Sequence, residues 1–539
     1  MGSHDEKNEA AKAGMTRRQF LQAGAVVGLG AGLAGSGLLA GCGGSGGGSR
    51  ASPSASGATG AVKPGGIMTL ATDQLFPKDN LNTLTNTTDG VDALEGLLRE
   101  GLVTYDMAFT AQPRLAQSWE TNADLTEYTF HLRPNVTWHD GTPFTAKDAE
   151  WSLQRILDPK EGSGMNARLL QSFGPNDIKV VDDLTLKLQL KQPDSLLLLA
   201  LSNQQCYFTK ANSTKADFEK GIGTGPFKLK SWNPGQSYEV EKYAGYYVKG
   251  EPILDGVRGI SIPEASTKLQ AVAAGTSDVT QISFDQIPVV KANPKLQITP
   301  YEKGITYNVV CDCTVKPFND NRVRQALKLS LDRTNVIAVA YAGQGFASPD
   351  AWVAAGDPFM TPDLIAATKM DRAKATQLMT EAGLPNGVDL ELKYPGDPLH
   401  ANFGLAVVAG LKGSLFRVTG KQIPADTYWD TVWMKDPFCV DDWNRRHPIE
   451  TMVLNCKTGV PWNESKFSDP KMDALIAKAY TVSGDALKQA TSDACLYMSQ
   501  NSGEVIPAYL NRLWTARVGT KVVPWTFSMM DFRKMGFLA

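Results

Sequence analysis

Apolar residues recur at every second position in several short stretches of the chain. This alternation marks the segments 128–132, 184–190 and 388–394, where polar residues occupy the intervening positions. A period of two places the apolar side chains on one face of an extended strand. We therefore expect a strand in each segment, with one face packed against a core and the other face more exposed.

Other stretches repeat apolar residues every three or four positions, which predicts helices. Thr145 can cap a helix in which Asp148 stands three residues on, and an apolar stripe follows. Three more helices are expected, beginning after Asp320, at Asp371 and at Pro470. Because strands and helices mix along the chain, the pattern predicts an α/β or α+β protein.

Composition narrows the class of protein. The 539 residues include 42% hydrophobic and 20% charged residues, which is ordinary for a globular protein and excludes disorder, collagen and coiled coil. The length suggests two to four domains. The formal charge of −2 gives no electrostatic reason to bind nucleic acid. Only 5 histidines are present, which argues against a catalytic metal site built from histidines, and we expect no metal or cofactor.

The N-terminal region carries the features of an export signal and an anchor. The pair Arg17-Arg18 precedes an apolar stretch and resembles the twin-arginine motif, so residues 1–41 are expected to be an export signal. The sequence LAGC ending at Cys42 resembles a bacterial lipobox, which implies cleavage before Cys42 and lipidation of its sulfur. Residues 42–60 then form a Gly/Ser-rich tether. The alternative is an ordinary signal followed by a chance cysteine.

Several motifs in the body of the chain are informative only as a set. They are YTFHLRPNVTWHDGTPFTAKDAEWSLQRILDP (128–159), GTGPF (223–227), IPEASTKLQAVAAGTSDV (262–279), Asn308 and KPFNDNRVRQALKLSLDR (316–333). In this order and spacing the chain resembles the family 5 solute-binding proteins of ABC importers, which bind dipeptides, oligopeptides or nickel chelates. The resemblance runs from about residue 66 to the C-terminus. The glycines of GTGPF allow tight backbone geometry before Pro226.

The resemblance implies a large two-lobed α/β fold of the type II periplasmic-binding-protein class, with an extra domain inserted in the first lobe. The implied domains are domain I (61–95, 191–305 and 506–539), the inserted domain II (96–190) and domain III (306–505). The lobes would close on a ligand by a hinge motion about the crossovers near 305 and 506.

No catalytic constellation stands out in the sequence. A nucleophile elbow, a P-loop, an H-E-x-x-H motif and a dinucleotide fingerprint are all missing. His447 could act as a general base with Asp441 or Asp442 nearby, although a pocket or surface histidine is the favoured interpretation. We therefore expect a binding protein and not an enzyme.

Six cysteines follow Cys42, and an exported protein can join them in three disulfides. Cys311 and Cys313 are two residues apart on an expected strand, so they share a face and do not readily pair with each other. Cys439 lies on another expected strand of the same lobe. A bridge between Cys439 and either Cys311 or Cys313 is the favoured pairing, and the alternative is that several cysteines are buried free thiols.

The expected ligand site is aromatic and polar. Clefts that bind small molecules combine aromatic walls with a few placed polar groups, although each tryptophan could equally be core. The candidate ligand-binding residues are Gln74, Asn308, Trp429, Trp433, Trp443, Arg445, Arg446, His447, Trp462 and Tyr509.

In peptide-binding relatives, a Trp matching Trp443 is followed closely by an Asp that grips the ligand's α-ammonium. Here the three residues after Trp443 are Asn444, Arg445 and Arg446. An arginine would repel an ammonium and offers a bidentate fork to a carboxylate or phosphate. The sequence therefore casts doubt on an ordinary peptide with a free N-terminus; the alternative is a small alignment slip with both arginines in solvent.

Together these features predict a monomeric, lipid-anchored, extracytoplasmic protein that captures a peptide or other small polar solute and delivers it to a permease and its ATPase. Two rival hypotheses remain open: a chemosensory or regulatory receptor of the same fold, and a periplasmic hydrolase. A permease gene beside this one would favour transport, and a turnover assay would expose a hydrolase.

Overall fold

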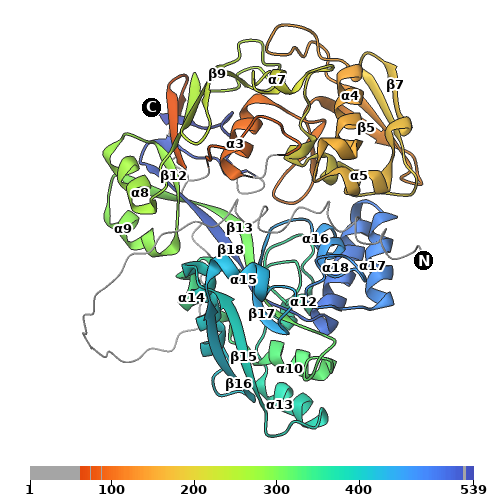
Figure 1. Cartoon of the computed structure of the whole chain (residues 1–539), viewed down its shortest axis with the longest axis vertical. Helices are drawn as coiled ribbons and strands as arrows, with labels where there is room; N and C mark the ends of the chain where they lie inside the picture. The colour runs from red at the N-terminus through yellow and green to blue at the C-terminus, as the bar shows by residue number, and fades with distance from the viewer. Residues whose placement is uncertain (1–60, 73–74, 86–87, 526–529) are drawn as a thin grey trace, which may run out of the picture.

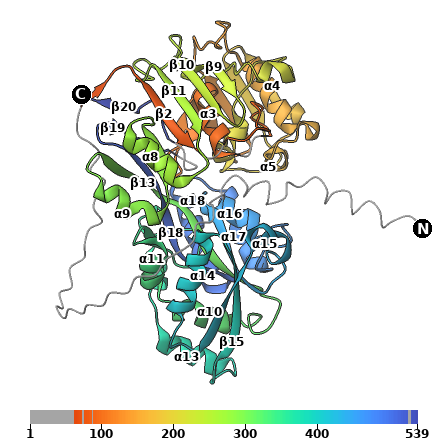
Figure 2. The ribbon, with the colours of Figure 1, turned by 60° about the vertical axis from the view of Figure 1, so that its left-hand side comes forward.

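A computed structural model describes residues 61–72, 75–85, 88–525 and 530–539 of the chain. Its elements form two lobes, one above the other in Figure 1, and both lobes contain strands and helices. Two long strands, β13 (Leu296–Cys311) and β18 (Glu504–Arg517), run from the upper lobe into the lower lobe, as Figure 1 and Figure 2 both show. The expected α/β fold of two lobes is confirmed.

One 11-stranded sheet extends through both lobes, in the order β16-β15-β17-β13-β18-β12-β2-β11-β10-β9, with β14 paired to β18. The pair β13–β18 lies near the middle of this order and connects the strands of the two lobes. The upper strands are β2 (Ile67–Thr72), β9 (Phe227–Asn233), β10 (Ser237–Lys242), β11 (Gly256–Ser261) and β12 (Val279–Ile282). The remaining strands are β14 (Gly345–Ala347), β15 (Val388–Pro395), β16 (Phe416–Ile423) and β17 (Phe438–Asn444).

The pairing of β13 with β18 is irregular where the strands pass from one core to the other. Tyr301 packs in the core of the upper lobe and Tyr307 packs in the core of the lower lobe. Between them the register shifts from Tyr301 to Ile305, and Lys303 adopts a left-handed φ of 58°. An irregularity of this kind bends a strand and increases its twist. The crossovers expected near 305 and 506 both fall on this strand pair.

The upper lobe contains a separate antiparallel sheet with its own hydrophobic core. The expected strands 128–132 and 184–190 correspond to β6 and β8 of this sheet, so both are confirmed. Its strands are β5 (Ala116–Thr121), β6 (Glu127–Leu132), β7 (Ile178–Asp182) and β8 (Thr185–Gln189), and a short hairpin of β3 (Val103–Tyr105) and β4 (Ala111–Pro113) lies nearby in sequence.

The helix predicted after Thr145 is α4 (Ala146–Leu157), and it begins with the predicted capping box. The Thr145 backbone N–H donates to Asp148 Oδ2 at 2.9 Å, which satisfies a group that would otherwise have no partner. The other helices of the upper lobe are α3 (Asp89–Leu98), α5 (Asn166–Ser172), α6 (Leu197–Leu201), α7 (Lys215–Phe218), α8 (Ala265–Ala274) and α9 (Ile287–Ala292).

The lower lobe contains the other three predicted helix starts. Asp320 and Asp371 cap α10 and α13 by accepting backbone N–H groups, and Pro470 is the first residue of α17. The helices are α10 (Asn321–Ser330), α11 (Arg333–Tyr341), α12 (Pro362–Ala367), α13 (Arg372–Glu381), α14 (Pro398–Gly410), α15 (Ala425–Thr431), α16 (Pro448–Asn455), α17 (Pro470–Tyr480) and α18 (Gly484–Asn501).

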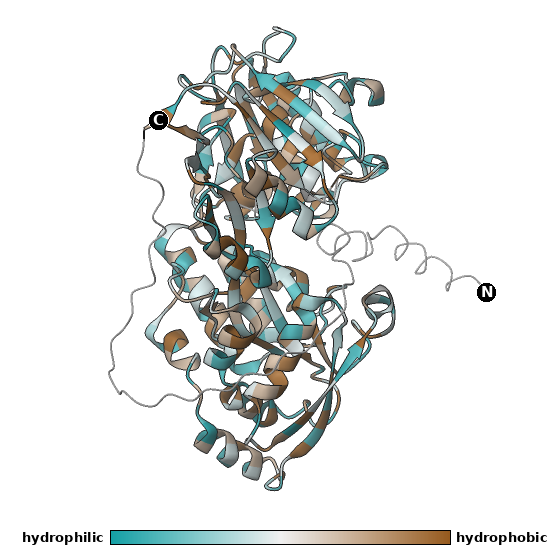
Figure 3. Ribbon diagram, turned by 90° about the vertical axis from the view of Figure 1, so that its left-hand side faces the viewer, coloured by the Kyte–Doolittle hydropathy of each residue, from teal (hydrophilic) through white to brown (hydrophobic). Residues whose placement is uncertain are grey.

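The two ends of the described chain meet in a small sheet. In it β1 (Val62–Lys63) pairs with β20 (Gly536–Leu538), which also pairs with β19 (Thr520–Lys521). Figure 3 shows hydrophobic and hydrophilic residues alternating along the elements of both lobes, as amphipathic strands and helices require. Among the described residues, no helix combines the length and the apolar character needed to cross a membrane.

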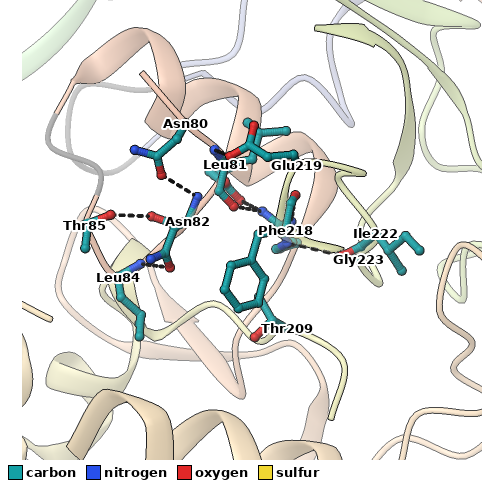
Figure 4. Close-up of polar contacts among 12 residues, drawn as sticks. Asn80, Leu81, Asn82, Leu84, Thr85, Thr209, Phe218, Glu219, Ile222 and Gly223 are labelled. Atoms are coloured by element: carbon teal, nitrogen blue, oxygen red, sulfur yellow. Dashed lines mark hydrogen bonds and ion pairs between the residues drawn. The ribbon is translucent and has the colours of Figure 1, made fainter. Parts of the chain in front are cut away.

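Arg99, the residue after α3, holds three segments of the upper lobe together. Its buried guanidinium donates to the carbonyl oxygens of Leu81, Phe218 and Ile222 and pairs with the Glu95 carboxylate. Figure 4 shows Leu81 from one part of the chain close to Phe218 and Ile222 from another. Carbonyl oxygens that lie far apart in the sequence therefore share one cation, and this brings the segment around residue 223 close to the end of α3.

Gly223 is needed at this close approach. A Cβ built on Gly223 would lie 1.9 Å from the carbonyl oxygen of Leu98, and one on Gly225 would lie 2.6 Å from that of Leu97. The nearest atom in both cases is a backbone carbonyl oxygen, which cannot move aside as the end of a flexible side chain could. The tight geometry expected for the glycines of GTGPF is observed.

His400 is a buried charged group in the lower lobe. Its Nδ1 donates to Asp397 Oδ2 at 2.8 Å, and its Nε2 donates to Asp442 Oδ1 at 3.1 Å. The rings of Tyr307 and Trp429 contact the imidazole edge-on. Burial alone would lower the pKa of His400, but the two carboxylates outweigh burial and raise it to about 9. At neutral pH the imidazolium therefore joins α14 to β17.

We predict that replacing Gly223 by Ala lowers the free energy of unfolding by about 1–3 kcal/mol or more, because the new methyl group overlaps the backbone. Gly96→Ala is the matched control. It lies in α3, its added Cβ would be 3.9 Å from the nearest atoms, and the change should stabilise the protein by about 0.5–1 kcal/mol. Chemical denaturation measures both effects, and equal stability of the two variants would contradict the prediction.

We also predict that the protonated His400 stabilises the folded protein, so the free energy of unfolding falls as the pH rises. The folded protein keeps the proton up to a pKa of about 9, whereas the unfolded chain loses it near about 6.5. The stabilisation is therefore complete below pH ~6.5 and is lost as the pH rises to ~9, by at most about 3 kcal/mol. In His400→Gln this loss should vanish from unfolding curves measured across that range; a slope that persists unchanged would exclude His400 as its source.

Candidate functional site

Strand β17 brings the candidate residues of the lower lobe next to β13. The two strands are antiparallel, and Asn308 lies opposite Asp441 while Thr306 lies opposite Trp443. Because side chains alternate along a strand, these four residues share one face of the sheet. Asp442 lies on the other face, where it accepts the hydrogen bond from His400.

One carboxylate organises the tryptophans on this face. Trp443 Nε1 donates to Glu464 Oε1 at 2.8 Å and to Asp441 Oδ2 at 3.0 Å. Trp433 Nε1 donates to Glu464 Oε2 at 2.9 Å, and the Trp462 ring meets that of Trp443 edge-on at 6.1 Å between centroids. Three of the expected aromatic residues are therefore held in one cluster with fixed ring orientations.

A second buried carboxyl group lies beside this cluster. Asn308 Nδ2 donates to Glu504 Oε2 at 2.6 Å. Burial is the main reason that the pKa of Glu504 rises to about 8; the hydrogen bond from Asn308 opposes the rise and the Asp441 charge adds to it. Glu504 therefore carries a proton at neutral pH, so the face holds a neutral acid next to the carboxylates of Asp441 and Glu464.

Neither Glu464 nor Glu504 was expected from the sequence. Glu464 stands two residues after Trp462, and Glu504 begins β18, but nothing in those local patterns distinguishes them from solvated acids. Their burial, 3% and 0% exposed, and their hydrogen bonds to Trp443 and Asn308 add them to the candidate site.

Arg445 and Arg446 have different surroundings. Arg445 is buried, its Nη2 donates to Asp357 Oδ1 at 2.8 Å, and its guanidinium lies 4.7 Å from the centre of the Phe109 ring. Arg446 is half-buried, and its Nη1 donates to the Asn444 carbonyl oxygen at 3.4 Å. The possibility that both arginines lie in solvent does not hold for Arg445.

Two buried tyrosines lie near these arginines. Burial raises the pKa of Tyr105 and of Tyr509 well above the usual value, while the charges of Arg445 and Arg446 act to lower both. Tyr105 belongs to the upper lobe in β3, and Tyr509 belongs to the connecting strand β18. The two arginines therefore lie where the lobes meet, within electrostatic reach of both.

His447 is a structural residue here. Its Nδ1 accepts the backbone N–H of Ile449 at 3.3 Å, which caps α16, and its ring lies edge-on to Phe109 and Phe359. Burial lowers the pKa of His447 to about 3, so the imidazole is neutral. Its nitrogen serves the helix cap, whereas Asp442, one of its two expected partners, bonds to His400.

Three other candidates lie elsewhere or outside the described residues. The Trp429 ring contacts His400 at 5.6 Å and Trp433 at 6.5 Å between centroids, so it adjoins the tryptophan cluster. Gln74 and Cys42 lie outside the described residues.

The predicted bridge from Cys439 to Cys311 or Cys313 is wrong. All three are free cysteines. Cys439 lies opposite Val310 in the β13–β17 register and packs with it, whereas Cys311, one residue on, points to the opposite face of the sheet. Cys313 lies beyond the end of β13. Burial raises the pKa of the Cys439 and Cys311 thiols, so they remain protonated.

Comparison with known proteins gives a consistent result. The family model of the bacterial extracellular solute-binding proteins, family 5, matches residues 110–448. The glutathione-binding protein GsiB of Pectobacterium atrosepticum is 30% identical over 299 residues, which cover 53% of this chain and 56% of that protein. The dipeptide-binding protein DppE of Bacillus subtilis is 25% identical over 453 residues, which cover 76% and 81% of the two chains.

A solved structure shares the fold. The ABC transporter substrate-binding protein CtaP from Listeria monocytogenes superposes with a TM-score of 0.76 at 19% identity and covers 88% of this chain and 100% of its own. The chain spans only about half the length of GsiB, so the likeness to GsiB does not extend over that whole protein. The family model matches well over half of the chain, and the two-lobed fold agrees with it. The chain therefore belongs to the bacterial extracellular solute-binding proteins of family 5.

Proposed function

We propose that this chain is the solute-binding component of an ABC importer, which captures a small polar solute between its lobes and delivers it to a permease and its ATPase. The observation that carries the proposal is the match of the family 5 model to residues 110–448 in a chain whose two lobes are joined by β13 and β18. A two-strand connection suits a hinge, because few residues have to change conformation. A peptide or peptide conjugate is one candidate solute, since relatives are named for dipeptide and glutathione binding.

The proposed ligand site combines an aromatic wall with charged groups. Trp443 and its neighbours Trp433 and Trp462 would supply the wall, with their orientations set by Glu464. Arg445 is buried and Arg446 is partly exposed, and for this reason we assign the contact with an anionic group of the ligand to Arg446. A planar guanidinium can form two parallel hydrogen bonds with a carboxylate or phosphate. The position of Arg446 near Tyr105 and Tyr509 supports a role at the junction of the lobes.

We infer that the protein has no catalytic step. His447, the candidate general base, is neutral and its ring nitrogen caps a helix. A general base needs a pKa close to the working pH, and a pKa of about 3 is far below it. A sensory receptor of the same fold remains the main rival, and a permease gene beside this one would favour transport.

The domain division that the resemblance implies is also a proposal, with residues 96–190 as the inserted domain and residues 306–505 as the second lobe. The separate sheet β5-β6-β8-β7, which packs its own hydrophobic core, supports an inserted unit. We propose that the protein acts as a monomer.

We propose, too, that the protein is exported and anchored on the outer side of the membrane by lipid on Cys42. The twin-arginine-like Arg17-Arg18, the lipobox-like LAGC and the Gly/Ser tether 43–60 support this hypothesis. One lipid chain anchors weakly, and additional chains would make the attachment durable.

The function is tested by native mass spectrometry of the purified protein, which should reveal a co-purified solute. With that solute, Arg446→Ala should weaken binding about tenfold to a hundredfold, since a charge-assisted hydrogen bond contributes roughly 1.5–3 kcal/mol. Arg446→Lys should restore part of the loss, because an ammonium keeps the charge without the planar fork. Isothermal titration measures all three affinities.

Arg417→Ala is the control, because Arg417 is an exposed residue of β16 that pairs with Asp389 at 2.6 Å. It should bind like the unchanged protein. Equal affinity of Arg446→Ala and the control would remove Arg446 from the site, and failure to detect any bound solute or any binding from a solute panel would count against the solute-binding function.

We predict that Cys42→Ala releases the protein from membranes without changing solute affinity, because the Gly/Ser-rich sequence 43–60 separates Cys42 from the residues of the proposed site. Membrane fractionation followed by a high-salt wash measures attachment. A Cys42→Ala protein that stays in the washed membrane fraction would show that something other than lipid on Cys42 holds it there.

A further inference from the structure

A hairpin of the upper lobe reaches into the lower lobe. Phe109, between β3 and β4, lies over the Arg445 guanidinium at 4.7 Å from the ring centre. The same ring meets His447 edge-on at 5.6 Å and stacks on Phe359 at 6.2 Å between centroids. These three partners belong to the lower lobe, so Phe109 occupies an aromatic and cationic socket on the opposite side of the lobe junction.

The backbone at Phe109 is held in an unusual conformation. Its φ is 63°, in the left-handed region that bulky residues rarely adopt. Such a conformation persists where surrounding contacts over-determine it. Tyr105 stacks on Phe109 from its own hairpin at 5.8 Å between centroids, so the ring is held from both lobes.

A second contact joins the lobes at a different place. Arg168 of α5 pairs with Asp194 in the upper lobe at 2.9 Å and with Glu450 of α16 in the lower lobe at 3.2 Å. Beside it, the Ser195 backbone N–H donates to the Tyr480 carbonyl oxygen at 3.0 Å. The Ser195 hydroxyl donates to the Ala479 carbonyl oxygen at 2.7 Å.

The socket of Phe109 is connected to the irregular region of β13. Asp357 Oδ1 accepts from Arg445 Nη2 at 2.8 Å and from Lys303 Nζ at 3.0 Å. Lys303 is the left-handed residue at the register shift between the two cores, and the Arg445 backbone N–H donates to the Gly304 carbonyl oxygen at 3.1 Å. One carboxylate therefore links the region where the strands bend to the residue on which Phe109 rests.

We propose that Phe109 in its socket and the Arg168–Glu450 pair form a two-point latch that holds the lobes together without a bound solute. Both points are made of protein groups alone. Asp357 couples the first point to the bend in β13, because it accepts hydrogen bonds from both Lys303 and Arg445. The latch shifts the equilibrium of the solute-free protein toward the closed form. A bound solute then shifts the same equilibrium further toward closure.

The latch is tested on the solute-free protein, so the outcome does not depend on the proposed solute-binding function. The Ser195 amide is the reporter, because its hydrogen bond crosses between lobes. Phe109→Ala should speed hydrogen exchange at Ser195 by roughly threefold to thirtyfold, the range expected for losing a cation–π contact. Glu450→Gln should have a smaller effect in the same direction. The amides of β6, within the upper lobe, should exchange at the unchanged rate, and small-angle scattering should give a larger radius of gyration for both variants.

Matched controls come from the same elements. Met107→Ala changes an exposed residue of the same hairpin, and Asp485→Asn changes an exposed acid in α18 that pairs with Lys488 within the lower lobe. Phe109→Leu is a milder variant that keeps an apolar side chain and removes only the ring, so it is less prone to misfold than Phe109→Ala. It should speed hydrogen exchange at Ser195 less than Phe109→Ala does. If Ser195 exchange and the radius of gyration in Phe109→Ala and Glu450→Gln match those of the controls, the latch is overturned.

Discussion

The antiparallel pairing of β13 with β18 is the constraint on which the rest of the molecule depends. The two strands pair from Leu296 with Arg517 in the upper lobe to Val310 with Glu504 in the lower lobe. Their backbone groups form hydrogen bonds with one another along most of this length, so both cores are built on the same pair of strands. The pairing is interrupted where the cores meet, and Lys303 at that interruption adopts a left-handed φ of 58°.

Buried charge is the second organising feature. Asp357, Asp441, Glu464 and Glu504 are all largely inaccessible to water. Burying a carboxylate is costly unless it is paired or protonated, and the molecule uses both solutions. Arg445 and Lys303 neutralise Asp357, while Glu504 keeps its proton because burial raises its pKa to about 8. Indole N–H groups of Trp443 and Trp433 fix the orientation of Glu464.

The sequence predicted local structure well and side-chain partnerships poorly. The capping box at Thr145, the caps at Asp320 and Asp371 and the alternating strands follow from residues within a few positions of one another. Short-range hydrogen bonds and periodicity decide such features. The disulfide prediction failed because it depended on a strand register: Cys439 lies opposite Val310, and a difference of one residue moves a side chain to the other face.

By itself, the sequence determined the α/β character, the helix and strand positions and the motif set that resembles family 5. Only the tertiary structure decided that Arg445 is buried against Asp357, and that His447 caps a helix. It also decided that Glu464 and Glu504 form hydrogen bonds with candidate site residues. Asp357 and Arg445 are 88 residues apart, and Asn308 and Glu504 are 196 apart. Contacts at such separations arise from how strands and lobes pack, and no local pattern of residues encodes them.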